Sequence, residues 1–248
     1  MTAADFFPPQ SIAVGFSRGE LIQEGMPPRL RRYSIRWKFE RELRPEGVAL
    51  IAGVDEVGRG CWAGPVYAAA AILPDGFKHR HLRDSKALLV EYREELSHHL
   101  CGHPEVVWSI GIGSVEEIES HNILGASLLA MRRAVEGLRQ QPQLCLIDGN
   151  QEAGMPCTEV TVVDGDARCP SIAAAAVIAK VARDRAMAEL AALYPLYGLE
   201  NHKGYGTPEH ARALTLHGPC PIHRRGFKPV RNYAHAQAGD DGGDRGLW

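Results

Sequence analysis

The pattern of apolar and polar residues divides this chain into short, continuous apolar runs and longer stretches with helical periodicity. The short runs have the length of buried strands and are bounded by glycine, proline or acidic residues. They predict strands over residues 48–55, 65–73, 106–113, 144–148 and 159–163.

Helices are expected where apolar residues recur three and four positions apart. Two of them start with local signals: Ser114 and Glu117 form a capping box, and Pro208 follows Thr207 at a first turn. The expected helices cover residues 34–45, 88–100, 115–139 and 171–193, with another between Thr207 and Gly218.

The order of these elements predicts an α/β fold. We expect a sheet of about five strands flanked by helices. The sheet should be mixed in direction, because the first two strands form a hairpin and the later strands are separated by helices. Paired prolines and scattered glycines make residues 1–33 a flexible extension, and residues 233–248 have the composition of a disordered tail. Residues 34–232 are then expected to form the folded domain.

Bulk composition narrows the possible functions only slightly. The net charge of −2 gives no whole-chain signature of nucleic-acid binding, although basic residues gather over 29–44 and 203–231. No pair among the six cysteines has C-x-x-C spacing, and no apolar run has the length of a membrane span. Because nothing at the N-terminus resembles a signal peptide, a cytoplasmic location is expected.

Two adjacent carboxylates, Asp55 and Glu56, end one of the apolar runs. A buried strand does not end in two charges without compensation, and hard divalent cations such as Mg²⁺ prefer oxygen ligands. Asp148 ends a second run, and Asp184 lies on the long alanine-rich helix, four residues after Lys180. If the two strands are parallel neighbours, these acids meet at one sheet edge, where a pair of metal ions can support hydrolysis.

Each acid also has a simpler interpretation. Asp148 before Gly149 is typical of a turn, and Asp184 between two arginines is typical of a surface ion pair. Asp55 and Glu56 fit a simple interpretation least well. Because adjacent strand residues point to opposite faces, both reach one metal site only if the strand ends or bends there.

The glycines that follow the acids suggest a different hypothesis, a dinucleotide-binding loop. Their spacing, Gly58-x-Gly60-x-x-x-Gly64, differs from G-x-G-x-x-G, and Pro65 opens a strand rather than a helix. Acids beside Arg59 and bare backbone amides favour metal-assisted chemistry on a phosphate instead. A later loop, 201–207, holds a tyrosine among cations and glycines, which can stack on a sugar or base or simply precede a helix.

Taken together, these segments resemble the bacterial ribonuclease HII family, whose members cut the RNA strand of RNA–DNA hybrids. The matching segments follow the family order between residues 36 and 231. They are 55–60, 84–86, 122–124, 147–149, 165–167, 171–175, 179–184 and 202–207.

The resemblance implies an RNase H-like fold with C-terminal helices over the substrate groove. It implies that two Mg²⁺ or Mn²⁺ ions are held by Asp55, Glu56, Asp148 and Asp184. Cleavage on the 5′ side of a ribonucleotide, in hybrids or at single ribonucleotides embedded in duplex DNA, would leave 3′-hydroxyl and 5′-phosphate ends. The role would be removal of ribonucleotides and RNA primers. The expected state is a monomer without membrane association, and a sliding clamp is a candidate partner.

The resemblance also implies contacts to the substrate. Gly58, Arg59 and Gly60 would contact the ribonucleotide, with backbone amides reading the 2′-hydroxyl that distinguishes RNA from DNA. Tyr205 would pack against the sugar beside the cut. Lys86, Asn122 and Lys180 would contact phosphates or orient the chain, and Ser85 would also bind the substrate.

The chain departs from the family pattern at several positions, none of them a catalytic acid. These positions are Cys61, Trp62, Leu89, Asp164 and Gly226. Two other functions remain as alternatives: a protein that binds hybrids without cutting them, and a DNA nuclease or resolvase of the same superfamily.

Overall fold

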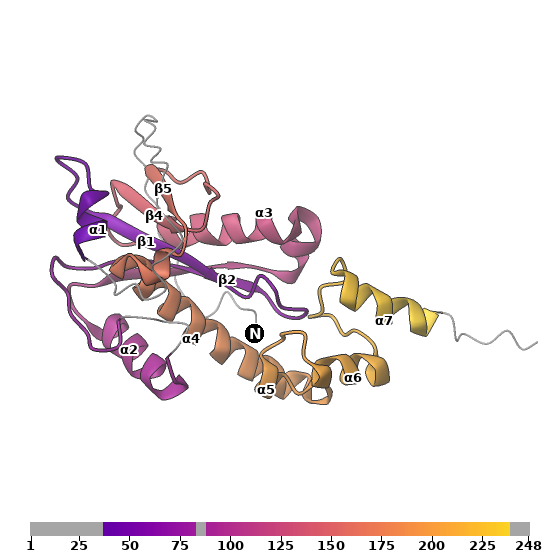
Figure 1. Cartoon of the computed structure of the whole chain (residues 1–248). Coiled ribbons are helices and arrows are strands. Elements are labelled where there is room, and N and C mark those ends of the chain that lie inside the picture. The colour runs from indigo at the N-terminus through magenta and orange to yellow at the C-terminus, as the bar shows by residue number, and fades with distance from the viewer. Residues whose placement is uncertain (1–36, 83–87, 239–248) are drawn as a thin grey trace, which may run out of the picture. The chain divides into compact units, whose positions relative to one another are not determined.

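The computed structural model describes residues 37–82 and 88–238. The predicted extension over 1–33, and the expected substrate contacts Ser85 and Lys86, therefore lie outside the described residues. Five strands form one sheet in the order β3-β2-β1-β4-β5 (Figure 1). The strands are β1 (Ile51–Val57), β2 (Val66–Ile72), β3 (Val107–Gly113), β4 (Leu144–Asp148) and β5 (Thr158–Val162).

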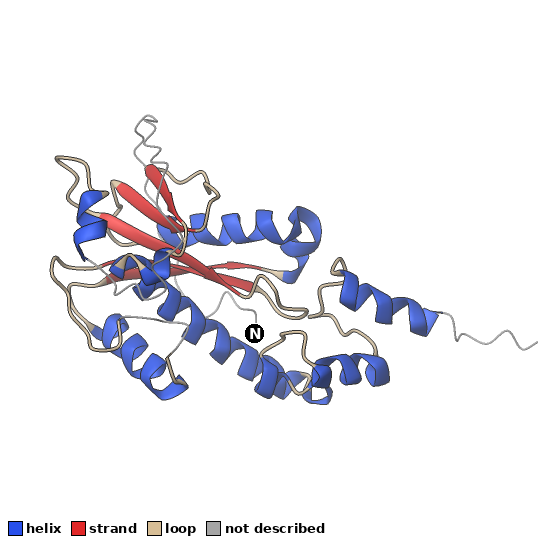
Figure 2. Cartoon of the chain, viewed as in Figure 1, coloured by secondary structure: helices blue, strands red, loops and turns tan. Residues whose placement is uncertain are grey.

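Seven α-helices and two short 3₁₀ segments accompany the sheet in the described part of the chain. The α-helices are α1 (Trp37–Glu42), α2 (Val90–Gly102), α3 (Val115–Glu136), α4 (Pro170–Leu193), α5 (Leu199–His202), α6 (Pro208–His217) and α7 (Lys228–Ala238). The 3₁₀ segments are η2 (Gly165–Ala167) and η3 (Pro195–Tyr197). Figure 2 separates the helices from the strands by colour.

The sheet is mixed, as predicted. β1 pairs with β2 antiparallel and with β4 parallel, and β4 pairs with β5 parallel. The antiparallel pair confirms the early hairpin. The parallel pairs follow from the helical connections, because a parallel neighbour needs a long crossover.

The chain divides into two compact units. Unit 1 holds the described residues up to 57, together with 67–112 and 127–182. Unit 2 holds 58–66, 113–126 and the chain from 183 onward. The glycine-rich turn is thus grouped with the C-terminal helices, and the single folded domain over 34–232 stays a prediction.

Close packing of β1 against α4 organises unit 1. A Cβ atom on Gly53 would lie 2.1 Å from the backbone nitrogen of Ile172, so only glycine allows this approach. The packing of α4 extends onto β2, because Ala69 and Ala71 of β2 share a buried cluster with alanines of α4. Figure 1 shows α4 on one side of the sheet and α3 on the other.

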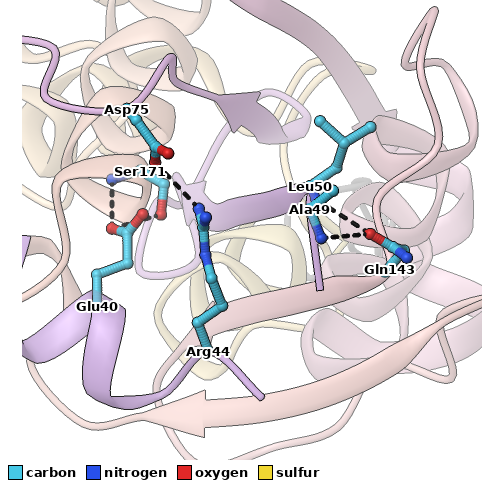
Figure 3. A network of polar contacts seen from close by, with 7 residues as sticks. All are labelled: Glu40, Arg44, Ala49, Leu50, Asp75, Gln143 and Ser171. Carbon is cyan, nitrogen blue, oxygen red and sulfur yellow. Dashed lines mark hydrogen bonds and ion pairs between the residues drawn. The ribbon is translucent and has the colours of Figure 1, made fainter. Parts of the chain in front are cut away.

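A buried carboxylate from α1 fixes the start of α4. Glu40 accepts hydrogen bonds from the backbone N–H of Ser171 at 3.1 Å and from its hydroxyl at 2.9 Å (Figure 3). The N-terminus of a helix favours a negative group, which explains why a buried glutamate lies here. Burial nevertheless raises the pKa of Glu40 above its ordinary value. Nearby, Arg44 pairs with Asp75 at 3.3 Å.

Unit 2 has its own apolar core. Its fully buried members include Ala63, Met187, Leu199 and Leu214, and partly buried aromatic residues pack around them. Tyr197 belongs to the same cluster and donates a hydrogen bond from its hydroxyl to the carbonyl of Gly218 at 2.8 Å.

Several local predictions are confirmed. Ser114 and Glu117 exchange the two capping-box hydrogen bonds at 3.2 and 2.9 Å. Thr207 accepts from the backbone N–H of His210 at 3.2 Å, with Pro208 in the first turn of α6. Leu89 precedes α2 without a side-chain cap.

Three boundaries differ from prediction. β1 continues through Glu56 to Val57 instead of ending at Asp55, because Val57 still pairs with Tyr67 of β2. α3 is interrupted at Asn122, whose φ of 57° and ψ of 173° are not helical. The tail from residue 233, expected to be disordered, is helical as far as Ala238 at the end of α7. Among the described helices, none has both the length and the apolar character required to span a bilayer.

Candidate active site

The ends of two neighbouring parallel strands bring two predicted acids together in unit 1. The register of β1 and β4 runs from Ile51 opposite Leu144 to Val54 opposite Ile147. Asp55 and Asp148 are the next residues of the two strands, so they occupy equivalent positions at the carboxyl end of the sheet. Equivalent positions on adjacent strands direct their side chains to the same face.

Backbone amides orient both carboxylates. Oδ1 of Asp55 accepts from the N–H of Glu56 at 2.8 Å, and Oδ1 of Asp148 accepts from the N–H of Gly165 at 2.7 Å. Gly165 opens η2, which follows Asp164 in a left-handed conformation with φ of 53°. The turn at Asp164, a departure from the family pattern, thus delivers the amide that holds Asp148.

The side chain of Glu56 is directed differently from that of Asp55. Because β1 remains paired beyond it, strand alternation directs Glu56 to the face opposite Asp55. β1 does not end at Asp55, so joint ligation by Asp55 and Glu56 requires a bend of the strand at this point. A role for Glu56 at the same metal site stays a prediction.

Asp184 lies on the part of α4 that belongs to unit 2, while Lys180 lies one turn earlier in unit 1. Over residues 37–82 and 88–238, no three His, Cys, Asp or Glu side chains gather as a ready-made metal site. Joint ligation by Asp55, Asp148 and Asp184 therefore stays a prediction.

The pair of Asp55 and Asp148 fits a divalent cation. Asp55 is only 5% exposed, and a buried carboxylate needs compensating positive charge. The donor set consists of carboxylate oxygens, which hard cations such as Mg²⁺ and Mn²⁺ prefer. Two such carboxylates side by side are the kind of site in which these ions bind.

The predicted glycine-arginine-glycine turn belongs to unit 2, and its two glycines have different surroundings. Gly58 is buried with φ of 96°, and a Cβ atom there would lie 2.2 Å from Nε of Arg183. Gly60 is exposed, and an added Cβ would meet nothing within 4 Å. Gly58 is thus required for packing inside the protein, whereas Gly60 leaves space in front of the backbone. The side chain of Arg59 is exposed between them.

Two buried arginines hold this turn from within unit 2. Arg183 donates to the carbonyls of Pro65, Lys203 and Ala63 at 3.1, 3.0 and 3.3 Å. Arg224 donates to the carbonyls of Gly64 and Arg59, both at 2.9 Å. Both side chains are 0% exposed, and burial lowers the pKa of Arg224 to about 10.

Neither arginine is predicted as a site residue by the sequence. The pattern around Arg183 indicates only a surface ion pair with Asp184. A usable signal was present, however, because Arg183 falls on the apolar stripe of α4 between Ala179 and Met187. No comparable periodicity marks Arg224, which lies in a loop.

Tyr205 is displayed by a loop whose glycines pack closely on the chain around Trp62. A Cβ atom on Gly204 would lie 2.5 Å from the carbonyl oxygen of Ala63, and one on Gly206 would lie 2.2 Å from the Trp62 ring. Trp62 also donates its backbone N–H to the carbonyl of Gly204 at 2.8 Å. Between these contacts Tyr205 remains 37% exposed, so part of its ring is available to a ligand.

The electrostatics around Tyr205 connect it with other predicted site residues of unit 2. Burial is the main cause that raises the pKa of Tyr205, and the negative charge of Asp184 contributes in the same direction. The Arg183 guanidinium lies 5.8 Å from the centre of the Tyr205 ring. Tyr205 and Asp184 are thus close enough to influence one another.

Asn122 has a local structural role. Its Oδ1 accepts from the backbone N–H groups of Leu124 and Gly125 at 2.9 and 3.1 Å, which caps the second part of α3. The residue is exposed. The predicted phosphate contacts of Asn122 and Lys180 stay predictions.

Comparison with known proteins places this geometry in a family. A family model described as Ribonuclease HII matches residues 52–230. A Ribonuclease HII from Bordetella pertussis strain Tohama I is 51% identical over 185 residues, covering 75% of this chain and 92% of that protein. Another from Granulibacter bethesdensis is 52% identical over 193 residues, covering 76% and 88%.

Solved structures are similar in fold. Ribonuclease H2 from Pyrococcus horikoshii OT3 has a TM-score of 0.63 and 25% identity, covering 76% of this chain and 98% of that one. Bst-RNase HIII in complex with Mn²⁺ has a TM-score of 0.60 and 17% identity, covering 77% and 71%. RNase HII of Archaeoglobus fulgidus, solved with PCNA, has a TM-score of 0.58 and 24% identity, covering 73% and 96%. These likenesses confirm the predicted RNase H-like α/β fold.

Proposed function

We propose a specific reaction on the premise that this chain belongs to the ribonuclease HII family and is a ribonuclease H acting on RNA–DNA. In it, the chain cuts on the 5′ side of a ribonucleotide, both in hybrids and at single ribonucleotides embedded in duplex DNA. The products carry 3′-hydroxyl and 5′-phosphate ends. The cellular role is removal of ribonucleotides and RNA primers.

One observation carries the proposal: Asp55 and Asp148 occupy equivalent positions at the ends of parallel neighbours β1 and β4. This is the sheet edge at which ligands of open α/β folds bind. Their carboxylates would hold the divalent ions, with Glu56 supporting one and Asp184 completing the second site. When bound, Mg²⁺ or Mn²⁺ ions supply an activated water and stabilise the departing oxygen.

The chain's own residues supply recognition. The open backbone at Gly60 lets the ribose 2′-hydroxyl approach main-chain donors, and this hydroxyl is what separates RNA from DNA. The exposed guanidinium of Arg59 attracts a phosphate. The partly exposed ring of Tyr205 gives the sugar beside the cut an apolar surface. Discrimination and cleavage thus fall to different residues.

The substitution Asp148→Asn tests the metal assignment. It removes the negative charge while keeping an acceptor for the Gly165 N–H, so the local fold should persist. We expect cleavage of a duplex with one embedded ribonucleotide to fall by at least about a thousandfold at any practical Mg²⁺ concentration, since metal activation of water is lost. Hybrid affinity, measured by fluorescence anisotropy, should change little.

Asp164→Asn is the matched control, because Asp164 lies near Asp148 and is exposed. Its left-handed conformation also suits asparagine. This control should cleave at the wild-type rate. Turnover retained by Asp148→Asn would exclude Asp148 as a metal ligand.

The same assay separates the alternatives. A wild-type chain that binds the embedded-ribonucleotide duplex without cutting it would be a binding protein. Equal cutting of an all-DNA duplex would indicate a DNA nuclease or resolvase. A sliding clamp stays a predicted partner, for which the Archaeoglobus RNase HII solved with PCNA is the precedent.

A further inference from the structure

Three histidines of unit 2 are buried together behind the Tyr205 loop. His202, His210 and His223 are 8%, 0% and 1% exposed. The rings of His202 and His210 are stacked with centres 4.4 Å apart, and those of His210 and His223 are 5.2 Å apart. The reaction proposed above uses none of them.

Their hydrogen bonds form a chain with one direction. The backbone N–H of Cys220 donates to Nδ1 of His223 at 3.0 Å, which makes that nitrogen an acceptor. A neutral His223 then carries its proton on Nε2, which lies 3.0 Å from Nε2 of His210. His210 accepts there and donates from Nδ1 to the carbonyl of Tyr205 at 2.9 Å. The chain thus ends on the backbone of the displayed tyrosine.

A second branch holds the neighbouring residue. The N–H of Gly204 donates to Nδ1 of His202 at 3.2 Å, so His202 carries its proton on Nε2 and donates to the carbonyl of Tyr197 at 2.8 Å. The Gly204 amide and the Tyr205 carbonyl are therefore each bonded to an imidazole. Because the two rings are stacked, the branches support one another.

This hydrogen-bond chain exists only while the imidazoles of His210 and His223 are neutral. A protonated His210 would place two N–H donors opposite each other at the 3.0 Å contact with His223, and a protonated His223 would place its Nδ1–H opposite the N–H of Cys220 at 3.0 Å. Around them lie His202, Tyr197, Glu209, Cys220 and Arg225. Burial outweighs the carboxylate of Glu209 and lowers the pKa of His210, and it lowers that of His223 to about 4.

We propose that His210 and His223 are positioning residues that fix the Tyr205 backbone for ribonucleotide recognition through this directional hydrogen-bond chain. The proposal rests on the proposed function, because it assigns recognition to Tyr205. Loss of the hydrogen-bond chain between the histidines would leave the carboxylates of unit 1 in place. Its effect is therefore expected on KM rather than on kcat.

Two substitutions of His210 distinguish the roles of its two ring nitrogens. Asparagine places an amide where the imidazole has Nδ1, so His210→Asn can still donate to the Tyr205 carbonyl. Glutamine reaches the position of Nε2, so His210→Gln can accept from His223 but loses the donor to Tyr205. We expect His210→Gln to raise KM for the embedded-ribonucleotide duplex about tenfold, as for loss of one hydrogen bond, with kcat within about twofold. His210→Asn keeps the donor to Tyr205 but loses the contact with His223, so its KM should lie between those of wild type and His210→Gln.

His217→Gln is the matched control, because His217 lies on the same helix and is exposed. Its KM should equal that of wild type. In a Tyr205→Ala background the backbone carbonyl remains, but the ring is absent. There His210→Gln should add less than about twofold, since coupled residues are not additive. Full additivity, or an unchanged KM for folded His210→Gln, would overturn the proposal.

Side-chain ¹⁵N NMR of the wild-type chain provides a test that needs no variant. The hydrogen bonds assign the Nδ1–H tautomer to His210 and the Nε2–H tautomer to His202 and His223, with His210 and His223 neutral at pH 7.5. The opposite tautomer at His210 or His223 would refute the proposed hydrogen-bond chain. Failure of the proposed function looks different: wild type would not cut the ribonucleotide duplex, or Tyr205→Ala would leave KM unchanged, whatever the NMR result.

Discussion

Single residues carry most of the chemistry in this chain. Asp55 and Asp148 were predictable because each ends an apolar run, and the structure shows them at equivalent strand positions. The sequence did not reveal that Gly58 and Gly60 differ. The packing of Arg183 against Gly58, which distinguishes them, is a long-range contact that no local pattern encodes.

Glu40 allows a prediction at this scale. Burial raises its pKa above the ordinary value of 4.5, so above that pH the folded chain holds more protons than the unfolded chain. The free energy of unfolding should then fall as pH rises above 4.5. Glu40→Gln keeps an oxygen acceptor for Ser171 but cannot titrate, and it should lose this part of the pH dependence. Urea unfolding at pH 5 and pH 7 measures the difference.

Glu40→Ala is the companion variant. It leaves the buried N–H and hydroxyl of Ser171 without their acceptor, which should lower the free energy of unfolding by about 2 kcal/mol at both pH values. Identical pH dependence in wild type and Glu40→Gln would show that Glu40 titrates normally in the folded chain.

At the scale of elements, strand and helix identities followed from periodicity, whereas several ends did not. β1 extends past its two acids because β2 continues to pair with it through Val57. α3 breaks at Asn122, where a side-chain cap replaces helical hydrogen bonds. Both features depend on competing local partners that a pattern of apolar residues does not record.

A second prediction about stability follows from the contact between β1 and α4. Gly53→Ala would place a methyl group 2.1 Å from backbone atoms of Ser171 and Ile172, which cannot move as a side chain can. We expect a loss of at least about 3 kcal/mol in the free energy of unfolding, as for severe overpacking. Gly102→Ala is the control, since nothing lies within 4 Å of its added Cβ. Equal urea midpoints for the two variants would contradict this packing.

At the scale of the whole molecule, the net charge of −2 conceals the basic regions that nucleic acid requires. The α/β class and strand content could be predicted from the order of elements, and the fold family from motifs in sequence. The division into two units could not. The glycine-rich turn joins the C-terminal helices through Arg183 and Arg224, which link positions far apart in the chain.

The charge distribution predicts a salt dependence. Hybrid binding should weaken as salt increases, because basic residues release counterions from phosphates. Arg59→Ala should lower affinity and reduce the slope of log affinity against log salt by about 1. An unchanged slope with unchanged affinity would show that the exposed Arg59 side chain does not meet a phosphate.

The most direct test of the account is anomalous diffraction at the manganese edge from crystals of the chain with Mn²⁺ and a ribonucleotide-containing duplex. It locates the metal independently of activity. We predict Mn²⁺ in contact with the carboxylates of both Asp55 and Asp148, at the ends of β1 and β4. Manganese bound beside the scissile phosphate without contact to either carboxylate would contradict the account.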